Sequence, residues 1–97
     1  MNQFTKDELA RAERRKRDYR IWLGRALNDR SMTEEDVDHY AAKLDLATQD
    51  VDRINQYGYH AAVLIEARRR GVPGAQKHLD ALASEQPMVI HEAIERG

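Results

Sequence analysis

Apolar residues recur along this chain at the spacing of α-helical turns, and this leaves little room for other secondary structure. Apolar residues have this spacing over residues 37–44, 51–65, 79–82 and 89–94. β-branched residues are sparse, and no run alternates between apolar and polar residues, so the pattern predicts an all-α protein. At 100° per residue, one stripe over the first 28 residues collects Leu9, Ala12, Tyr19, Leu23, Ala26 and Leu27.

Two helix starts carry the signature of a capping box, a Ser or Thr followed three residues later by an acid. Thr5 and Glu8 have this spacing, which predicts a first helix from Thr5 to about residue 28. Thr33 and Asp36 have the same spacing and predict a second helix. Its apolar face is expected to consist of Val37, Tyr40, Ala41 and Leu44. A short turn is expected near residue 46.

Thr48 is the expected N-cap of a third helix, in which Gly58 forms a break or a bend. Three arginines before Gly71 suit the end of that helix, because cations complement its dipole and glycine accepts a left-handed cap. Pro73 and Pro87 suit the first turns of a fourth and a fifth helix. We therefore expect one small domain over residues 1–97, with four or five helices in orthogonal or bundle-like packing.

Length and cysteine content restrict the setting of the protein. A chain of 97 residues has room for one core. It contains no cysteine, which excludes disulfides, thiolate nucleophiles and cysteine-ligated metals and fits a reducing compartment. No apolar run approaches the ~20 residues of a membrane span, and the first ten residues lack the apolar core of a secretory signal. We expect a soluble, cytoplasmic protein that does not associate with membranes.

The sequence offers no candidate for catalysis, metal binding or a cofactor. No two histidines have the i,i+3 or i,i+4 spacing that places two metal ligands on one helix face. Ser31 and Ser84 lie near predicted helix starts, where capping accounts for them. Nucleophile-elbow, phosphate-loop and dinucleotide-binding motifs do not occur. We expect a protein that is not an enzyme and that has no catalytic residues, no metal site and no cofactor.

Charge is distributed unevenly along the chain, although the net charge is only −1. Residues 1–30 contain nine Lys and Arg against five acids, whereas residues 31–56 contain two against seven. These segments are expected to pair within the fold or between chains, which makes a homodimer a candidate assembly.

The first helix also carries a candidate contact surface on its polar side. Ile21 lies almost opposite the apolar stripe, with Arg14, Arg17 and Arg25 at i−7, i−4 and i+4. Arginine and a central apolar anchor are typical of protein interfaces, and a half-exposed Trp22 at the edge of the stripe would extend the patch. The hypothesis is a small interaction protein, of the kind that phages and mobile elements encode, which regulates or inhibits a partner with an acidic surface. A solvated charged face with one stray Ile21 remains the alternative.

The stretch YAAKLDLATQDVDRI, residues 40–54, resembles the bihelical unit of phage-repressor-type helix-turn-helix proteins. Lys43, Leu44 and Leu46 match the end of the scaffold helix and the turn, and Val51 and Ile54 match the apolar anchors of the recognition helix. The resemblance implies a DNA-binding transcriptional regulator as the alternative function. The acidic residues in and around this segment, however, would repel the phosphates of DNA. The residues that would reach DNA are Thr48, Gln49, Arg53 and Gln56.

Overall fold

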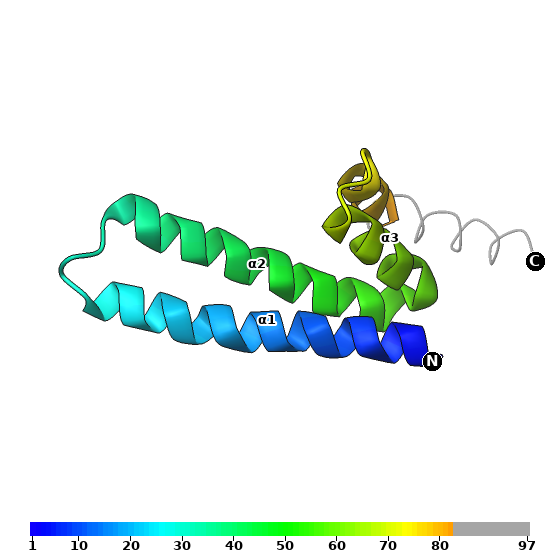
Figure 1. Cartoon of the computed structure of the whole chain (residues 1–97), viewed down its shortest axis with the longest axis horizontal. Helices are drawn as coiled ribbons and strands as arrows, with labels where there is room; N and C mark the ends of the chain where they lie inside the picture. The colour runs from blue at the N-terminus through cyan, green and yellow to red at the C-terminus, as the bar shows by residue number, and fades with distance from the viewer. Residues whose placement is uncertain (83–97) are drawn as a thin grey trace, which may run out of the picture.

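The structure, a computed structural model, describes residues 1–82 and is all-α. Helices α1 (Gln3–Asn28) and α2 (Glu34–Tyr57) form a long antiparallel hairpin. Helix α3 (Tyr59–Arg69) and a fourth helical segment over residues 75–82 pack at the end of the hairpin where the chain begins (Figure 1). The expected all-α class is confirmed. The fifth helix expected after Pro87 lies outside the described residues.

Helix α1 begins earlier than the capping box predicted. The N-cap is Asn2, whose side-chain oxygen accepts hydrogen bonds from the backbone N–H of Thr5 at 2.8 Å and from its hydroxyl at 2.7 Å. Asparagine caps a helix as well as threonine does, and this choice places Thr5 and Glu8 inside the helix. Both are buried in the described fold. The expected N-cap role of Thr5 was therefore wrong.

Helix α2 starts as predicted but does not end at the expected turn. Thr33 and Asp36 form a complete capping box. The helix then runs unbroken through residues 45–48, and the hydroxyl of Thr48 donates to the carbonyl oxygen of Leu44 at 2.9 Å. No Gly or Pro interrupts residues 34–57, and the buried residues Ala47, Asp50, Val51 and Ile54 continue the helical spacing. The turn at residue 46 and the N-cap at Thr48 were wrong.

Glycines with positive φ form the remaining boundaries. Gly58, with φ 63° and ψ −128°, separates α2 from α3, so the predicted break at this glycine is confirmed. At the end of α3, the N–H of Gly71 donates to Arg68 and the N–H of Val72 donates to Ala67, which is a Schellman motif. The fourth helical segment begins at residue 75, two residues after the expected start at Pro73.

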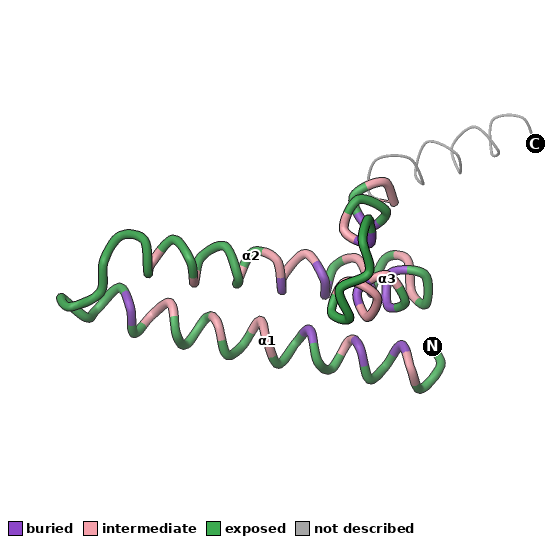
Figure 2. Tube along the Cα trace, turned by 45° about the horizontal axis from the view of Figure 1, so that its top comes forward, coloured by how far each residue is buried: buried purple, intermediate pink, exposed green. Residues whose placement is uncertain are grey.

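The hydrophobic core lies where α3 crosses the hairpin (Figure 2). Within residues 13–46, which we call the distal arm, only Ala26 is buried. Leu27 and Ala41, both expected on buried faces, are exposed, because neither α3 nor the helical segment over residues 75–82 covers the arm where they lie. The core cluster consists of Ala12, Val51, Ile54, Ala61, Ala62, Ile65 and Leu79.

Among the helices described over residues 1–82, none combines the length and the apolar character needed to cross a membrane.

Candidate functional site

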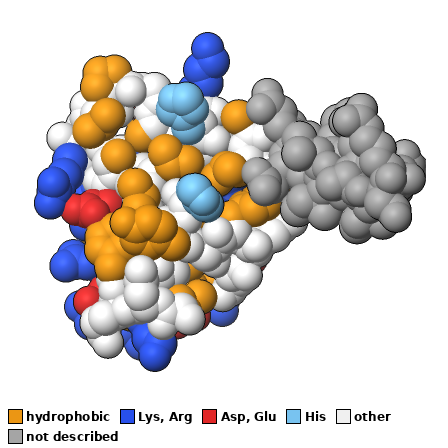
Figure 3. Space-filling view, turned by 90° about the vertical axis from the view of Figure 1, so that its right-hand side faces the viewer, with side chains coloured by type: hydrophobic (Ala, Val, Ile, Leu, Met, Phe, Trp, Pro, Cys, Tyr) orange, Lys and Arg blue, Asp and Glu red, His pale blue; other side chains and the backbone are white. Residues whose placement is uncertain are grey.

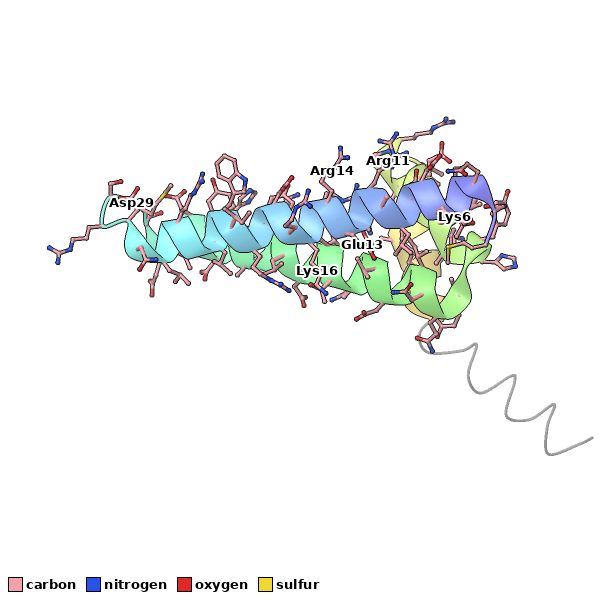
Figure 4. The ribbon with its side chains drawn as sticks, turned by 90° about the horizontal axis from the view of Figure 1, so that it is seen from below. Lys6, Arg11, Glu13, Arg14, Lys16 and Asp29 are labelled. Carbon is pink, nitrogen blue, oxygen red and sulfur yellow. The ribbon has the colours of Figure 1, made fainter. Side chains whose placement is uncertain are left out.

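The predicted contact residues of α1 lie on the distal arm and are exposed. Arg14, Arg17 and Arg25 are all in the exposed class, and Ile21 retains 47% of its accessible surface. Figure 4 shows Arg14 projecting from the edge of α1 opposite that of Lys16. We call the five predicted residues the docking face: Arg14, Arg17, Ile21, Trp22 and Arg25.

The indole of Trp22 links α1 to α2 without being covered. It stacks on the ring of Tyr40, with ring centroids 6.1 Å apart and planes at 27°, and 49% of Trp22 remains exposed. Beside the two rings is an open groove of about 410 Å³. We call it the aromatic groove, and its lining residues are Arg15, Asp18, Tyr19, Trp22, His39 and Tyr40. A half-exposed aromatic pair beside a groove can accept an apolar anchor from a partner.

The oppositely charged segments pair far less than their composition suggested. Within residues 1–82, one ion pair joins a base of residues 1–30 to an acid of residues 31–56. It places Arg15 3.6 Å from Asp50. Arg17 forms an ion pair with its neighbour Asp18, at 3.9 Å, and no ion pair involves Arg14 or Arg25 in this part of the chain. The arginines of the docking face therefore have little internal compensation.

Sequence reasoning missed a buried carboxylate at the junction of three helices. Asp50, on α2, has only 1% of its surface exposed, and its carboxylate accepts two hydrogen bonds from the guanidinium of Arg68 on α3. Arg68 also donates to the side-chain oxygen of Gln76 at 2.7 Å. The available signal was the helical spacing of Asp50 with Ala47, Val51 and Ile54, which places it on the apolar face of a continuous α2.

A second buried carboxylate joins the start of α1 to the end of α3. Glu8 accepts two hydrogen bonds, each of 2.8 Å, from the guanidinium of Arg69. The side-chain hydrogen bond to Glu8 raises the pKa of Arg69 above its ordinary value, and partial burial opposes this increase. Arg68 and Arg69 thus do more than complement the helix dipole, because they neutralise the two buried acids of the core region.

The residues expected to contact DNA are dispersed along one continuous helix. The guanidinium of Arg53 donates to Gln49 at 3.0 Å and to Asp80 at 3.4 Å, and only 14% of its side chain is exposed. The side-chain amide of Gln49 also donates to Asp45, and the hydroxyl of Thr48 donates to the carbonyl oxygen of Leu44 in the same helix. Gln56 is exposed on the same helix. The bihelical unit implied by the resemblance is not formed, because its turn is helical.

Two histidines, His60 and His78, lie at the end of the molecule opposite the distal arm. Figure 3 shows two histidine side chains among apolar ones on this end of the molecule. His60 and His78 line a groove there together with Tyr59, Val63, Leu64, Ala81 and Leu82. Over residues 1–82, no group of three or more His, Cys, Asp or Glu side chains is placed to hold a metal ion. The linear spacing of the histidines gave no sign that His60 and His78 would share a groove.

A search for similar proteins found no match to a family model, to a curated protein or to a solved structure.

Proposed function

We propose that this protein is a helical interaction module that regulates or inhibits a partner protein by occupying part of its surface. The docking face on the distal arm would make the contact. The absence of cysteine supports action in a reducing compartment such as the cytoplasm.

The observation that carries the proposal is the half-exposed Trp22 on an arm that neither α3 nor the helical segment over residues 75–82 covers. Apolar side chains are expensive to leave in water, at about 25 cal/mol per Å². Single apolar side chains are often exposed on protein surfaces, but the distal arm exposes four large apolar side chains within twelve positions. They are Ile21, Trp22, Leu27 and Met32.

The charge around this surface favours an acidic partner. Arg14 and Arg25 lie at i−7 and i+4 from Ile21, and neither has an ion pair within residues 1–82. Arginine is enriched at interfaces because its planar guanidinium forms paired hydrogen bonds with carboxylates. An apolar anchor framed by arginines would therefore fit an apolar pocket with carboxylates at its rim.

The matched control for this face is another arginine of the same helix. Arg20 is exposed, has no ion pair in the described residues, and lies about 100° around α1 from Ile21. The measurement is affinity capture of the partner protein from a cell lysate by each variant. We expect Arg25→Glu and Ile21→Asp each to reduce the amount of captured partner at least tenfold, whereas Arg20→Glu leaves it unchanged. Circular dichroism should be the same for all three variants. Equal loss of capture in all three variants would contradict the proposal.

The single tryptophan gives a direct readout of the contact. Protein labelled with 5-fluorotryptophan would show one fluorine resonance, from Trp22. We expect this resonance to shift or broaden when the captured partner is added, because docking would change the surroundings of the indole. An unchanged resonance with bound partner would place the contact elsewhere on the molecule.

DNA binding is the second candidate. It rests on the sequence resemblance of residues 40–54 alone, because the continuous helix α2 does not contain the turn that this resemblance implies. It predicts a steeply salt-dependent change in fluorescence anisotropy with duplex DNA, lost on Arg53→Ala or Gln49→Ala. An absence of binding at ~50 mM salt would reject it, since low salt favours phosphate contacts.

A further inference from the structure

We propose that a pocket at the junction of α1, α2 and α3 binds a compact oxyanion, that is, a carboxylate or a phosphate group. The pocket has a volume of about 290 Å³, and we call it the arginine pocket. It is separate from the docking face, so this inference does not depend on the proposed function. The lining residues are Arg15, Tyr19, Lys43, Leu46, Ala47, Asp50, Ile65, Arg68 and Arg69.

The pocket has more positive charge than its own carboxylates neutralise. Of its lining residues four are basic and only Asp50 is acidic, and Glu8 adds a second carboxylate beside Arg69. Two positive charges therefore remain. The C-terminus of α3 contributes roughly half a negative charge at most, so the excess survives this correction.

Each of the two buried acids is paired with one arginine through two hydrogen bonds. Asp50 accepts two hydrogen bonds from Arg68, and Glu8 accepts two from Arg69. Both pairs have the forked geometry in which one guanidinium donates two parallel hydrogen bonds to one carboxylate. The excess charge consequently resides on the two other cations, Arg15 and Lys43.

Arg15 and Lys43 approach the pocket from different helices, α1 and α2. Arg15 is 3.6 Å from Asp50, forms no hydrogen bond with it, and has 33% of its side chain exposed. Lys43 has no ion pair or side-chain hydrogen bond within residues 1–82. Both cations therefore have donors available, and Tyr19 lines the same pocket with a phenolic hydroxyl. An oxyanion there would be held by charge-assisted hydrogen bonds in a partly desolvated site.

The test is a titration of the full chain, labelled with ¹⁵N, against sodium phosphate and against sodium acetate. Sodium chloride of equal ionic strength is the reference, because it reproduces screening without the oxyanion. We expect saturable shifts at the side-chain N–H of Arg15 and at the backbone amides of Ala47 and Arg68. Shifts with phosphate alone would assign the site to phosphate groups, and shifts with both anions would extend it to carboxylates. Shifts with neither anion would overturn the proposal.

Lys43→Gln is the primary variant, because Lys43 is exposed and forms no ion pair or side-chain hydrogen bond within residues 1–82, so its loss should leave the fold intact. It should weaken anion binding by about tenfold, the usual effect of one charge-assisted hydrogen bond. Arg15→Gln should do the same, and the fold should survive because Arg68 still donates two hydrogen bonds to Asp50. The matched control is Lys6→Gln, since Lys6 lies near the start of α1, away from this pocket (Figure 4). Equal weakening by Lys6→Gln and Lys43→Gln would show general charge screening and would also overturn the proposal.

Discussion

Asp50 and Arg68 lie eighteen residues apart in the chain, and their side chains form a buried, doubly hydrogen-bonded ion pair between α2 and α3. Glu8 and Arg69 form a similar pair between α1 and α3. Together the two pairs fix the orientation of α3 on the hairpin. They lie at the end of the molecule that holds the core, and within residues 1–82 no buried ion pair of this kind lies on the distal arm.

Replacing Asp50 with Asn should be strongly destabilising. The substitution leaves the largely buried guanidinium of Arg68 without its carboxylate, and breaking a buried pair in this way costs about 3 kcal/mol. Urea denaturation would measure the free energy of unfolding. Asp52→Asn is the matched control on the same helix, because Asp52 is exposed, and its effect should stay within about 0.5 kcal/mol. Similar losses in both variants would contradict the role assigned to the buried pair.

Two glycines should respond to alanine in opposite directions. Gly58 has φ 63°, and an added Cβ would meet no atom within 4 Å, so the cost of Gly58→Ala is backbone strain of about 1–3 kcal/mol. Gly24 lies inside α1, and a Cβ there also meets nothing within 4 Å. Gly24→Ala should therefore stabilise the fold by about 0.4–1 kcal/mol. Thermal unfolding of both variants tests the boundary at Gly58, and a neutral Gly58→Ala would count against it.

The loop between α1 and α2 should show a local pH dependence. The hydroxyl and the backbone N–H of Ser31 both donate to the carboxylate of Asp29. These hydrogen bonds, the one from the hydroxyl having the larger effect, lower the pKa of the Asp29 carboxyl group below its ordinary value. The contribution of this group to stability is present above its ordinary pKa and disappears as the pH falls through the lowered value. Carboxyl ¹³C chemical shifts should give a midpoint below that of an unstructured aspartate. Ser31→Ala should move the pKa of Asp29 part of the way back, and an unmoved midpoint would contradict this assignment.

The sequence predicted that the chain forms helices, but only some of the helix boundaries were predicted correctly. The capping box at Thr33, the break at Gly58 and the left-handed cap at Gly71 were all predictable, because each depends on residues within a few positions. The expected turn at residue 46 failed because residues 40–54 also satisfy the spacing of one continuous helix. Short-range spacing cannot distinguish two helices in line from two helices at an angle.

The candidate site was predicted in part, for a related reason. The helical period placed Ile21 opposite the buried stripe and Trp22 at its edge, and both are about half exposed. The stacking of Trp22 on Tyr40 and the pairing of Glu8 with Arg69 depend on contacts between helices far apart in the sequence. Periodicity assigns a residue to a face of its helix, but it does not say which element, if any, covers that face.

The docking face is tested most directly by photo-crosslinking at two positions of α1. A benzophenone amino acid would replace Ile21 in one version of the full chain and Arg20 in the other, and each would be irradiated in a lysate of the source cells. We predict a discrete protein adduct from position 21 and none from position 20. Equal adducts from both positions, or none from position 21, would contradict the account.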